Sequence, residues 1–213
     1  VIFSKNRTSK ASEMVSYLNQ NFTKLYPKHL NKSIEFQASP KISNQVEACL
    51  IDPPCFLETE PPLPENKNLK WAHSTWAGVD GFINDLQKPI NFQLTRSAIY
   101  GRMISEYILC NILNYERKMY QSYQNQLNST WDPVMDGHTY SSLKGRTMVV
   151  LGSGEIGTEL SRMMKYGFDV ETSAALVRRE RNPDHLVSNY FTSFNELANS
   201  EIAKEADYLV NIL

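Results

Sequence analysis

Short apolar runs alternate along the chain with segments whose apolar residues recur at helical spacing. In the first half the apolar runs are Val1–Phe3, Ile34–Phe36, Val46–Ile51 and Leu69–His73, and a helical pattern over Glu13–Leu25 follows the first of them. Short runs bounded by polar or proline-rich residues are typical of strands, whereas a 3.6-residue period predicts a helix. Repeated alternation of strand and helix favours an α/β fold built on a parallel sheet.

The middle of the chain carries the longest helical pattern. From Ser97 to Tyr120 apolar residues return at helical spacing without an intervening proline. This pattern predicts one long and well buried helix, with Glu106 as a buried, hydrogen-bonded anchor inside it. The polar, turn-rich segment Asn125–Leu143 is then expected to be an irregular connection.

A glycine motif follows the apolar run Thr147–Leu151, and a helical pattern follows the motif. In this context the first glycine permits a tight turn, the second admits a pyrophosphate close to the backbone, and the third lets the helix pack on the strand. The start of the helix adds unpaired N–H groups and a positive dipole end. The alternative is a chance glycine cluster in a surface turn. We expect a dinucleotide to be held by the backbone of Gly152, Gly154, Glu155, Ile156 and Gly157.

The charges after the next strand bear on the choice of cofactor. An acidic residue roughly 20 residues after the glycines is typical of NAD sites, but here the run Ala174–Val177 ends in Arg178 and Arg179. Two guanidinium groups suit a ribose 2′-phosphate, so NADP is favoured and NAD stays possible. One alternative is a solvated run of charges; another is a strand over Val170–Ala174, which would place the arginines beyond the ribose. The remaining patterns predict a helix over Ser193–Lys204 and a strand over Tyr208–Leu213.

Composition narrows the class of protein. The 213 residues are 41% hydrophobic and 21% charged with a net charge of −1, values of a globular protein without the basic excess of a nucleic-acid or membrane-surface binder. No apolar run is long enough to cross a bilayer, and the three cysteines lack metal-site spacing, so we expect a cytoplasmic protein without a metal. Because the chain begins with Val1 and stops in an apolar run at Leu213, we expect a piece of a longer protein.

Several segments together resemble the D-isomer-specific 2-hydroxyacid dehydrogenases, especially the glyoxylate and hydroxypyruvate reductases. The likeness covers about residues 46 to 213, and the order and spacing of its segments are more specific than the glycine motif alone. The segments that carry it are Leu69–Asp80, Leu94–Arg96 with Glu106–Tyr107, Trp131 with Leu143–Thr147, Gly152–Gly157 and Ala206–Asn211.

The resemblance implies a flavodoxin-like substrate domain over 1–94, a hinge helix over 95–120 and an incomplete Rossmann domain over 121–213. It implies an NAD(P)-dependent oxidoreductase that reduces a small 2-keto acid, such as glyoxylate or hydroxypyruvate, to the D-2-hydroxy acid. It also implies a homodimer for the full-length protein.

The same resemblance assigns substrate contacts to one loop, and the position of Arg96 just ahead of the long helix adds a second candidate. Backbone N–H groups of Trp76, Ala77 and Gly78 are expected to hold the substrate carboxylate, since clustered N–H groups form an anion nest. Arg96 is expected to pair with that carboxylate. The alternatives are a left-handed turn with Trp76 plugging the core, and a solvated hinge arginine.

No residue of this sequence is nominated as catalytic. Reduction of a 2-keto acid needs a group that polarises the carbonyl and a general acid. In the family that the chain resembles these are an arginine, a glutamate and a histidine beyond the position of Leu213. We therefore expect the chain alone to be inactive.

Two rival interpretations stay open. One is a non-enzymatic, dinucleotide-sensing interaction protein, like the transcriptional corepressors that share this fold, because fold alone does not decide function. The other is a different Rossmann protein such as a methyltransferase, against which the loop at Trp76–Gly78 and the long helix argue.

Overall fold

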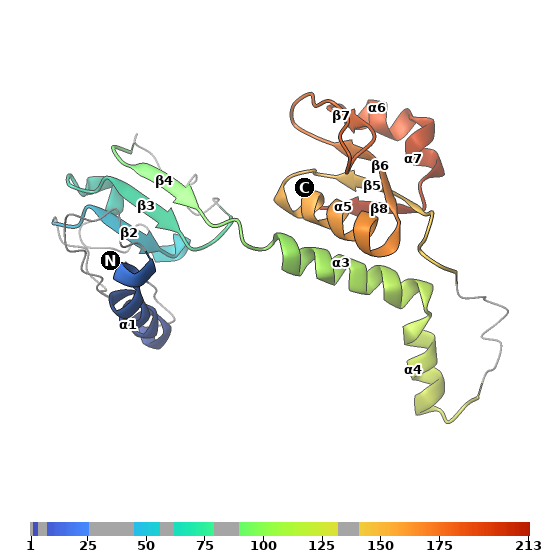
Figure 1. Ribbon diagram of the computed structural model, residues 1–213, viewed down its shortest axis with the longest axis horizontal. Helices are drawn as coiled ribbons and strands as arrows, with labels where there is room; N and C mark the ends of the chain where they lie inside the picture. Colours follow the sequence, from blue (N-terminus) through green and yellow to red (C-terminus); the bar gives the residue numbers. More distant parts are fainter. Residues whose placement is uncertain (1, 4–7, 26–44, 56–61, 79–89, 132–140) are drawn as a thin grey trace. The chain divides into compact units, whose positions relative to one another are not determined.

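The computed structural model describes residues 2–3, 8–25, 45–55, 62–78, 90–131 and 141–213 (Figure 1). Its contacts divide the chain into two compact units, Val1–Ala98 and Ile99–Leu213. Within the described residues each unit holds one four-stranded parallel sheet. The predicted parallel α/β architecture is thereby confirmed.

In the first unit the described sheet has the order β1-β2-β3-β4. Three of its strands confirm apolar runs of the sequence, whereas β4 was missed and the expected strand Ile34–Phe36 lies outside the described residues. The elements are β1 (Ile2–Phe3), α1 (Thr8–Leu25), β2 (Ala48–Ile51), β3 (Trp71–Ser74), β4 (Gln93–Arg96) and two short 3₁₀ helices, Pro53–Cys55 and Leu63–Glu65.

The core of this unit lies under β2 and β3. Cys49, Ile51 and Ala72 are buried there together with Leu63 and Phe92, and alternate residues of each strand are buried, as expected for a sheet packed mainly on one face. Burial raises the pKa of the Cys49 thiol to about 11. This cysteine is therefore a packed apolar group that stays protonated at neutral pH.

The second unit has the strand order β7-β6-β5-β8, with all pairs parallel. This is the 3-2-1-4 order of a Rossmann half-sheet, whose ligands bind outside the carboxyl ends of the strands where the order reverses. The central strand is buried on both faces, as parallel strands covered by helices are. The elements are α3 (Gly101–Glu116), α4 (Met119–Leu127), β5 (Thr147–Leu151), α5 (Glu155–Phe168), β6 (Glu171–Leu176), β7 (Tyr190–Phe191), α6 (Phe194–Asn199), α7 (Glu201–Glu205) and β8 (Tyr208–Asn211).

The prediction of one long helix over 97–120 was wrong. The chain breaks between α3 and α4 at Lys118, whose φ of 50° and ψ of 38° are left-handed, a conformation that stops a right-handed helix. Helix α3 packs on α5, and four of its residues join the core of the second unit, so it covers a face of the Rossmann sheet. These four are Ile108, Leu109, Ile112 and Leu113.

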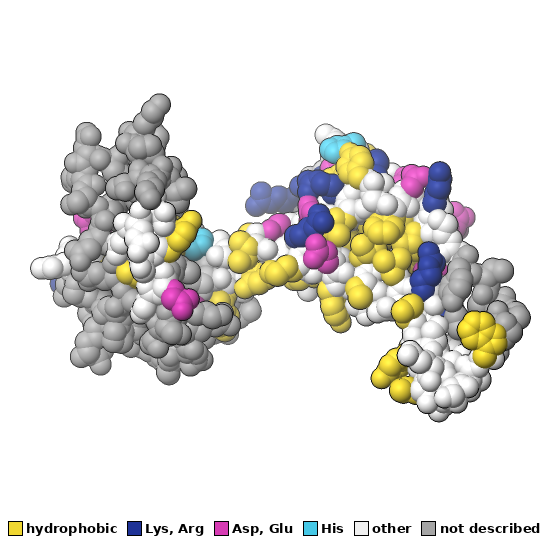
Figure 2. All heavy atoms as spheres, turned by 60° about the horizontal axis from the view of Figure 1, so that its bottom comes forward, with side chains coloured by type: hydrophobic (Ala, Val, Ile, Leu, Met, Phe, Trp, Pro, Cys, Tyr) yellow, Lys and Arg dark blue, Asp and Glu magenta, His cyan; other side chains and the backbone are white. Residues whose placement is uncertain are grey.

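The predicted burial of this region was also wrong. Glu106 is exposed and pairs with Arg102 one turn earlier, at 2.7 Å, whereas its neighbour Ser105 is fully buried and donates to the carbonyl of Gly101. The contact face of the helix is thus rotated by one residue from the expected one. Large apolar side chains remain exposed along α3 and α4 (Figure 2). In the described parts of the chain no helix combines the length and apolar character that crossing a bilayer requires.

A cluster of polar side chains joins the amino ends of β5 and β8 to each other and to the end of α3. Asp207 accepts the backbone N–H of Thr147 at 2.8 Å and pairs with Arg146, which joins the start of β5 to the start of β8. The hydroxyl of Tyr208 donates to Glu116 at 2.7 Å and joins β8 to the end of α3. These bonds lower the pKa of both carboxyl groups, and burial together with the bond to Glu116 raises the pKa of Tyr208.

Candidate functional site

The glycine motif forms a tight turn between β5 and α5. Gly152 has a φ of +107°, which favours glycine, and a Cβ there would lie 3.1 Å from the carbonyl oxygen of Ile212. A Cβ on Gly157 would lie 2.3 Å from the carbonyl oxygen of Gly152, closer than any real contact. The first and third glycines are therefore required by the protein's own packing.

Gly154 differs from the other two glycines, because a Cβ there would meet nothing within 4 Å. It is the N-cap of α5, next to the first backbone N–H groups of the helix, which lack helical partners. An open approach to a helix N-terminus fits a pyrophosphate. The turn therefore fits a dinucleotide, with Gly154, Glu155 and Ile156 placed to donate their N–H groups.

Strand β6 settles the register that the sequence left open. It spans Glu171–Leu176, so Arg178 and Arg179 follow its carboxyl end after one residue. A bulge at Ser173 adds a residue to this strand opposite Met148 and Val149. Both arginines are exposed at the ligand-binding edge of the sheet.

Arg181 is a residue of this region that sequence reasoning missed. Its Nη1 donates to the carbonyl oxygen of Ser153, between the first two glycines, at 3.1 Å. Its guanidinium also lies 5.4 Å from the centre of the Tyr190 ring. No motif signals such a residue, because both contacts depend on how the charged loop after β6 folds back.

A cavity of about 730 Å³ opens beside the glycine turn. It is lined by the turn, by the first turns of α5 and by the beginning of α3, and three arginines reach it. Two of them, Arg102 and Arg162, pair with Glu159. The lining residues that matter here are Ser153, Gly154, Glu155, Thr158, Glu159 and the arginines at 102, 162 and 181.

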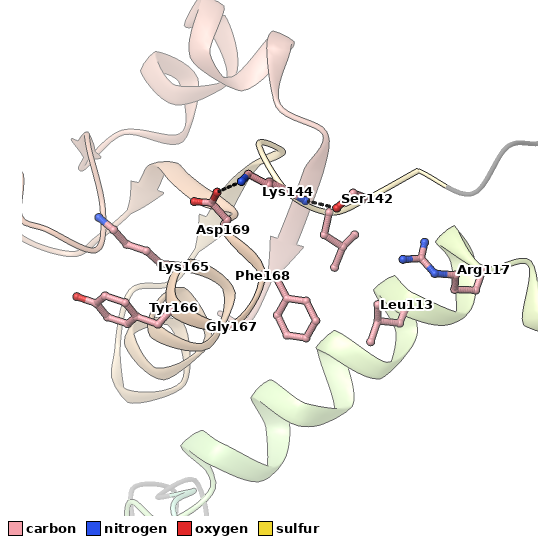
Figure 3. A pocket seen from close by; sticks show the side chains of 10 residues that line it. Leu113, Arg117, Ser142, Lys144, Lys165, Tyr166, Gly167, Phe168 and Asp169 are labelled. Atoms are coloured by element: carbon pink, nitrogen blue, oxygen red, sulfur yellow. Dashed lines mark hydrogen bonds and ion pairs between the residues drawn. The ribbon is translucent and has the colours of Figure 1, made fainter.

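Another cavity, of about 540 Å³, lies at the opposite end of α5 (Figure 3). Leu113 and Arg117 line it from the end of α3, and Lys144 and Asp169, which form an ion pair at 3.7 Å, line it from the segments that precede β5 and β6. Those segments mark the amino edge of the sheet. Because Rossmann ligands bind at the carboxyl edge, this cavity is not the dinucleotide site.

The predicted substrate residues lie together in the first unit, at the carboxyl ends of β3 and β4. Arg96 donates to the carbonyl oxygen of Ala77, which ties the end of β4 to the loop Trp76–Gly78. Among the described residues none accepts a hydrogen bond from the backbone N–H of Ala77 or Gly78. Trp76 is 48% exposed, so the alternative in which it plugs the core is excluded. The substrate roles of these four residues stay predictions.

Two side chains of β3, Ser74 and His73, make further hydrogen bonds near this loop. The hydroxyl of buried Ser74 accepts the N–H of Trp76 at 3.1 Å. His73 lies between two hydroxyl groups, with Nδ1 2.8 Å from Thr95 and Nε2 3.1 Å from Ser97. These contacts give His73 a structural place between β3 and β4.

Comparison with known proteins identifies the second unit. Residues 109–213 match the family model of the D-isomer specific 2-hydroxyacid dehydrogenase, NAD binding domain. This segment belongs to that family. The match spans the whole glycine turn and the four strands of the second sheet, so the turn described above lies in a segment that matches an NAD-binding domain.

Two curated relatives extend the likeness of this dehydrogenase domain. The 2-hydroxyacid dehydrogenase homolog 2 of Schizosaccharomyces pombe is 29% identical over 106 residues, which are 50% of this chain and 30% of that protein. The D-lactate dehydrogenase of Escherichia coli is 23% identical over 178 residues, 76% of this chain and 52% of that protein. The chain thus spans about half the length of the second relative and less than a third of the first.

Solved structures share the fold over the whole chain. A D-isomer specific 2-hydroxyacid dehydrogenase family protein from Aeromonas salmonicida matches 100% of this chain and 63% of its own with a TM-score of 0.68 and 22% identity. An NADPH-dependent glyoxylate/hydroxypyruvate reductase from Sinorhizobium meliloti, in complex with NADP and sulfate, matches 100% of this chain and 61% of its own with a TM-score of 0.64 and 17% identity. At these identities the likeness establishes the fold.

Proposed function

We propose that the chain is part of an NADP-preferring oxidoreductase that reduces a small 2-keto acid of the glyoxylate or hydroxypyruvate type to the D-2-hydroxy acid. The observation that carries the proposal is the glycine turn within a domain of the 2-hydroxyacid dehydrogenase family. In this turn there is space beside the backbone of Gly154, whereas the protein's own backbone lies close to Gly152 and Gly157. When bound, the nicotinamide cofactor supplies the hydride.

The loop of the first unit supports the choice of substrate. The N–H groups of Ala77 and Gly78 have no acceptor among the described residues, and the guanidinium of Arg96 is fixed beside them. Clustered N–H groups next to a cation suit a carboxylate. One of the solved relatives is named for activity on glyoxylate and hydroxypyruvate.

The activity is tested by following NADPH absorbance with glyoxylate and with hydroxypyruvate, using both the 213-residue chain and the longest natural reading frame that contains it. We expect turnover with the longer protein. We expect cofactor binding without turnover with the chain alone, because none of its residues matches the family's catalytic arginine, glutamate and histidine. Cofactor binding without turnover in the longer protein would sink the reductase and favour a dinucleotide-sensing role.

The preference for NADP rests on Arg178 and Arg179. Replacing both by alanine is expected to weaken NADPH binding by roughly tenfold or more, the size of losing a hydrogen bond to a charged group. Binding of NADH, which lacks the 2′-phosphate, should change little. Fluorescence titration of both cofactors measures this. The matched control is Lys144→Ala, which removes an exposed cation at the opposite edge of the sheet; equal losses for both cofactors would refute the assignment.

A further inference from the structure

The arginine pair at the end of β6 lies between two fixed points. On one side the N–H of Val177 donates to the carbonyl oxygen of Phe191 at 2.8 Å, which continues the pairing with β7. On the other side Arg181 donates to the carbonyl oxygen of Ser153 at 3.1 Å. Two residues span at most about 7 Å, so this second contact limits how far Arg179 can lie from the glycine turn.

Tyr190 holds Arg181 in place from β7. The guanidinium of Arg181 lies over its ring, an arrangement in which the ring face attracts the cation. The hydroxyl of Tyr190 donates to Asp184 at 2.7 Å. Ser153 is therefore held at its carbonyl group by Arg181, which Tyr190 and Asp184 in turn keep in place.

Asp184 anchors the far end of the same loop. Its Oδ1 accepts the N–H groups of Leu186 and Val187 at 2.8 and 2.9 Å, while its Oδ2 accepts the hydroxyl of Tyr190. A carboxylate that accepts three hydrogen bonds fixes its surroundings firmly. The loop after β6 is thus closed on itself, and through Arg181 it is joined to the glycine turn.

The charge of Arg181 is unusual within the cavity beside the turn. Arg102 and Arg162 are compensated there by Glu106 and Glu159. Among the residues that the structure describes, no carboxylate lies within ion-pair distance of Arg181, whose partner is a neutral carbonyl group. Among the described residues the hydrogen-bond acceptor of this guanidinium is the carbonyl oxygen of Ser153, so its hold on the loop comes from that bond and from the Tyr190 ring.

We propose that Arg181 is a positioning residue for cofactor discrimination: by holding the carbonyl group of Ser153 it fixes Arg178 and Arg179 beside the glycine turn, where they meet the 2′-phosphate. This inference rests on the proposed preference for NADP. It makes that preference a property of the folded loop, not of the two adjacent arginines alone.

The test is the ratio of dissociation constants for NADH and NADPH in the 213-residue chain and its variants. Arg181→Met is expected to lower this ratio by about tenfold, mainly through weaker NADPH binding, since NADH lacks the phosphate that the positioned arginines meet. Calorimetry with adenosine 2′,5′-bisphosphate and adenosine 5′-monophosphate should show the same fall, because these two probes differ only by the 2′-phosphate. Arg117→Met, which removes an arginine that also donates to a backbone carbonyl group but lines the cavity at the opposite edge of the sheet, should keep the ratio within about twofold.

Arg181→Lys separates charge from position, since lysine keeps the charge but lacks the planar group that bonds Ser153 while covering the Tyr190 ring. We expect the ratio of the NADH and NADPH dissociation constants to fall in this variant nearly as far as in Arg181→Met. A ratio unchanged in Arg181→Met, equal weakening of both cofactors, or full rescue by lysine would each overturn the inference while leaving the NADP preference intact. If the unmodified chain binds both cofactors equally, the NADP preference fails and the inference fails with it.

Discussion

Replacing Gly157 by alanine is expected to destabilise the second unit and to abolish dinucleotide binding. The added Cβ would lie 2.3 Å from the carbonyl oxygen of Gly152, and that atom belongs to the backbone of a tight turn, so it cannot rotate away as a flexible side chain could. Overpacking of this kind costs about 1–3 kcal/mol. Chemical denaturation measures the loss of unfolding free energy, and titration with NADPH measures the loss of binding.

Gly154→Ala is the matched control for this prediction. A Cβ at this position meets nothing within 4 Å, so the free energy of unfolding should change by no more than about 0.5 kcal/mol. Binding should nonetheless weaken by roughly tenfold or more, because the methyl group occupies the approach to the helix N-terminus. If Gly154→Ala bound cofactor normally, the pyrophosphate would not lie at this turn.

The second large effect is expected from Asp207→Asn. The carboxylate of Asp207 joins the starts of β5 and β8 by accepting the N–H of Thr147 and pairing with Arg146. Removing its charge weakens both bonds, and hydrogen bonds to charged groups contribute about 1.5–3 kcal/mol each. We expect a loss of about 1–2 kcal/mol at pH 7, with the lower figure reflecting partial exposure to solvent. Glu201→Gln, at an exposed helical pair, is the control and should be near neutral.

The pH dependence of stability follows from the same carboxyl groups. The pKa of Asp207 is lowered from 3.8, mainly by the N–H of Thr147 and then by Arg146, and the pKa of Glu116 is lowered from 4.5, mainly by Tyr208. A lowered folded-state pKa means that the stabilisation is complete above the unfolded value and is lost as the pH falls through the folded value. The stability difference between the unmodified chain and Asp207→Asn should therefore be constant from pH 7 to about 5 and shrink below about 4. A difference that grew on acidification would contradict this account.

The strands and the glycine turn were predictable because their signals are local. Thr147–Leu151 is a continuous apolar run, and the three glycines follow it at a spacing that only a tight turn before a helix requires. Strand β4 was missed because Gln93–Arg96 contains a single apolar residue, Leu94, and none of the four is fully buried. Its pairing with β3 defines it, and pairing is not visible in a short polar segment.

The helical region failed for a different reason. A periodic pattern gives the approximate face of a helix but not its phase, and a shift of one residue exchanged the expected burial of Glu106 for that of Ser105. The break at Lys118 has no proline or glycine to announce it. A left-handed lysine is tolerated there because the surrounding packing of α3 outweighs a cost of about 1–2 kcal/mol.

The role of Arg181 could not be predicted from the sequence. As part of a charged loop it resembles any solvated arginine, and its contacts with Ser153 and Tyr190 arise only when two segments distant in sequence meet. Arg178 and Arg179 could be nominated because they follow a strand directly. Residues that hold such a pair in place carry no comparable pattern.

The glycine turn packs against the end of the last strand of its sheet. Gly152 lies against the carbonyl group of Ile212, and the N–H of Ile212 donates to the carbonyl oxygen of Leu151 at 3.0 Å. During synthesis the motif leaves the ribosome well before β8. Its residues therefore exist for a time without the strand against which the turn packs. The ability to bind a dinucleotide thus arises only when β8 has paired, and a bound cofactor is a reporter that folding of this half-sheet has finished.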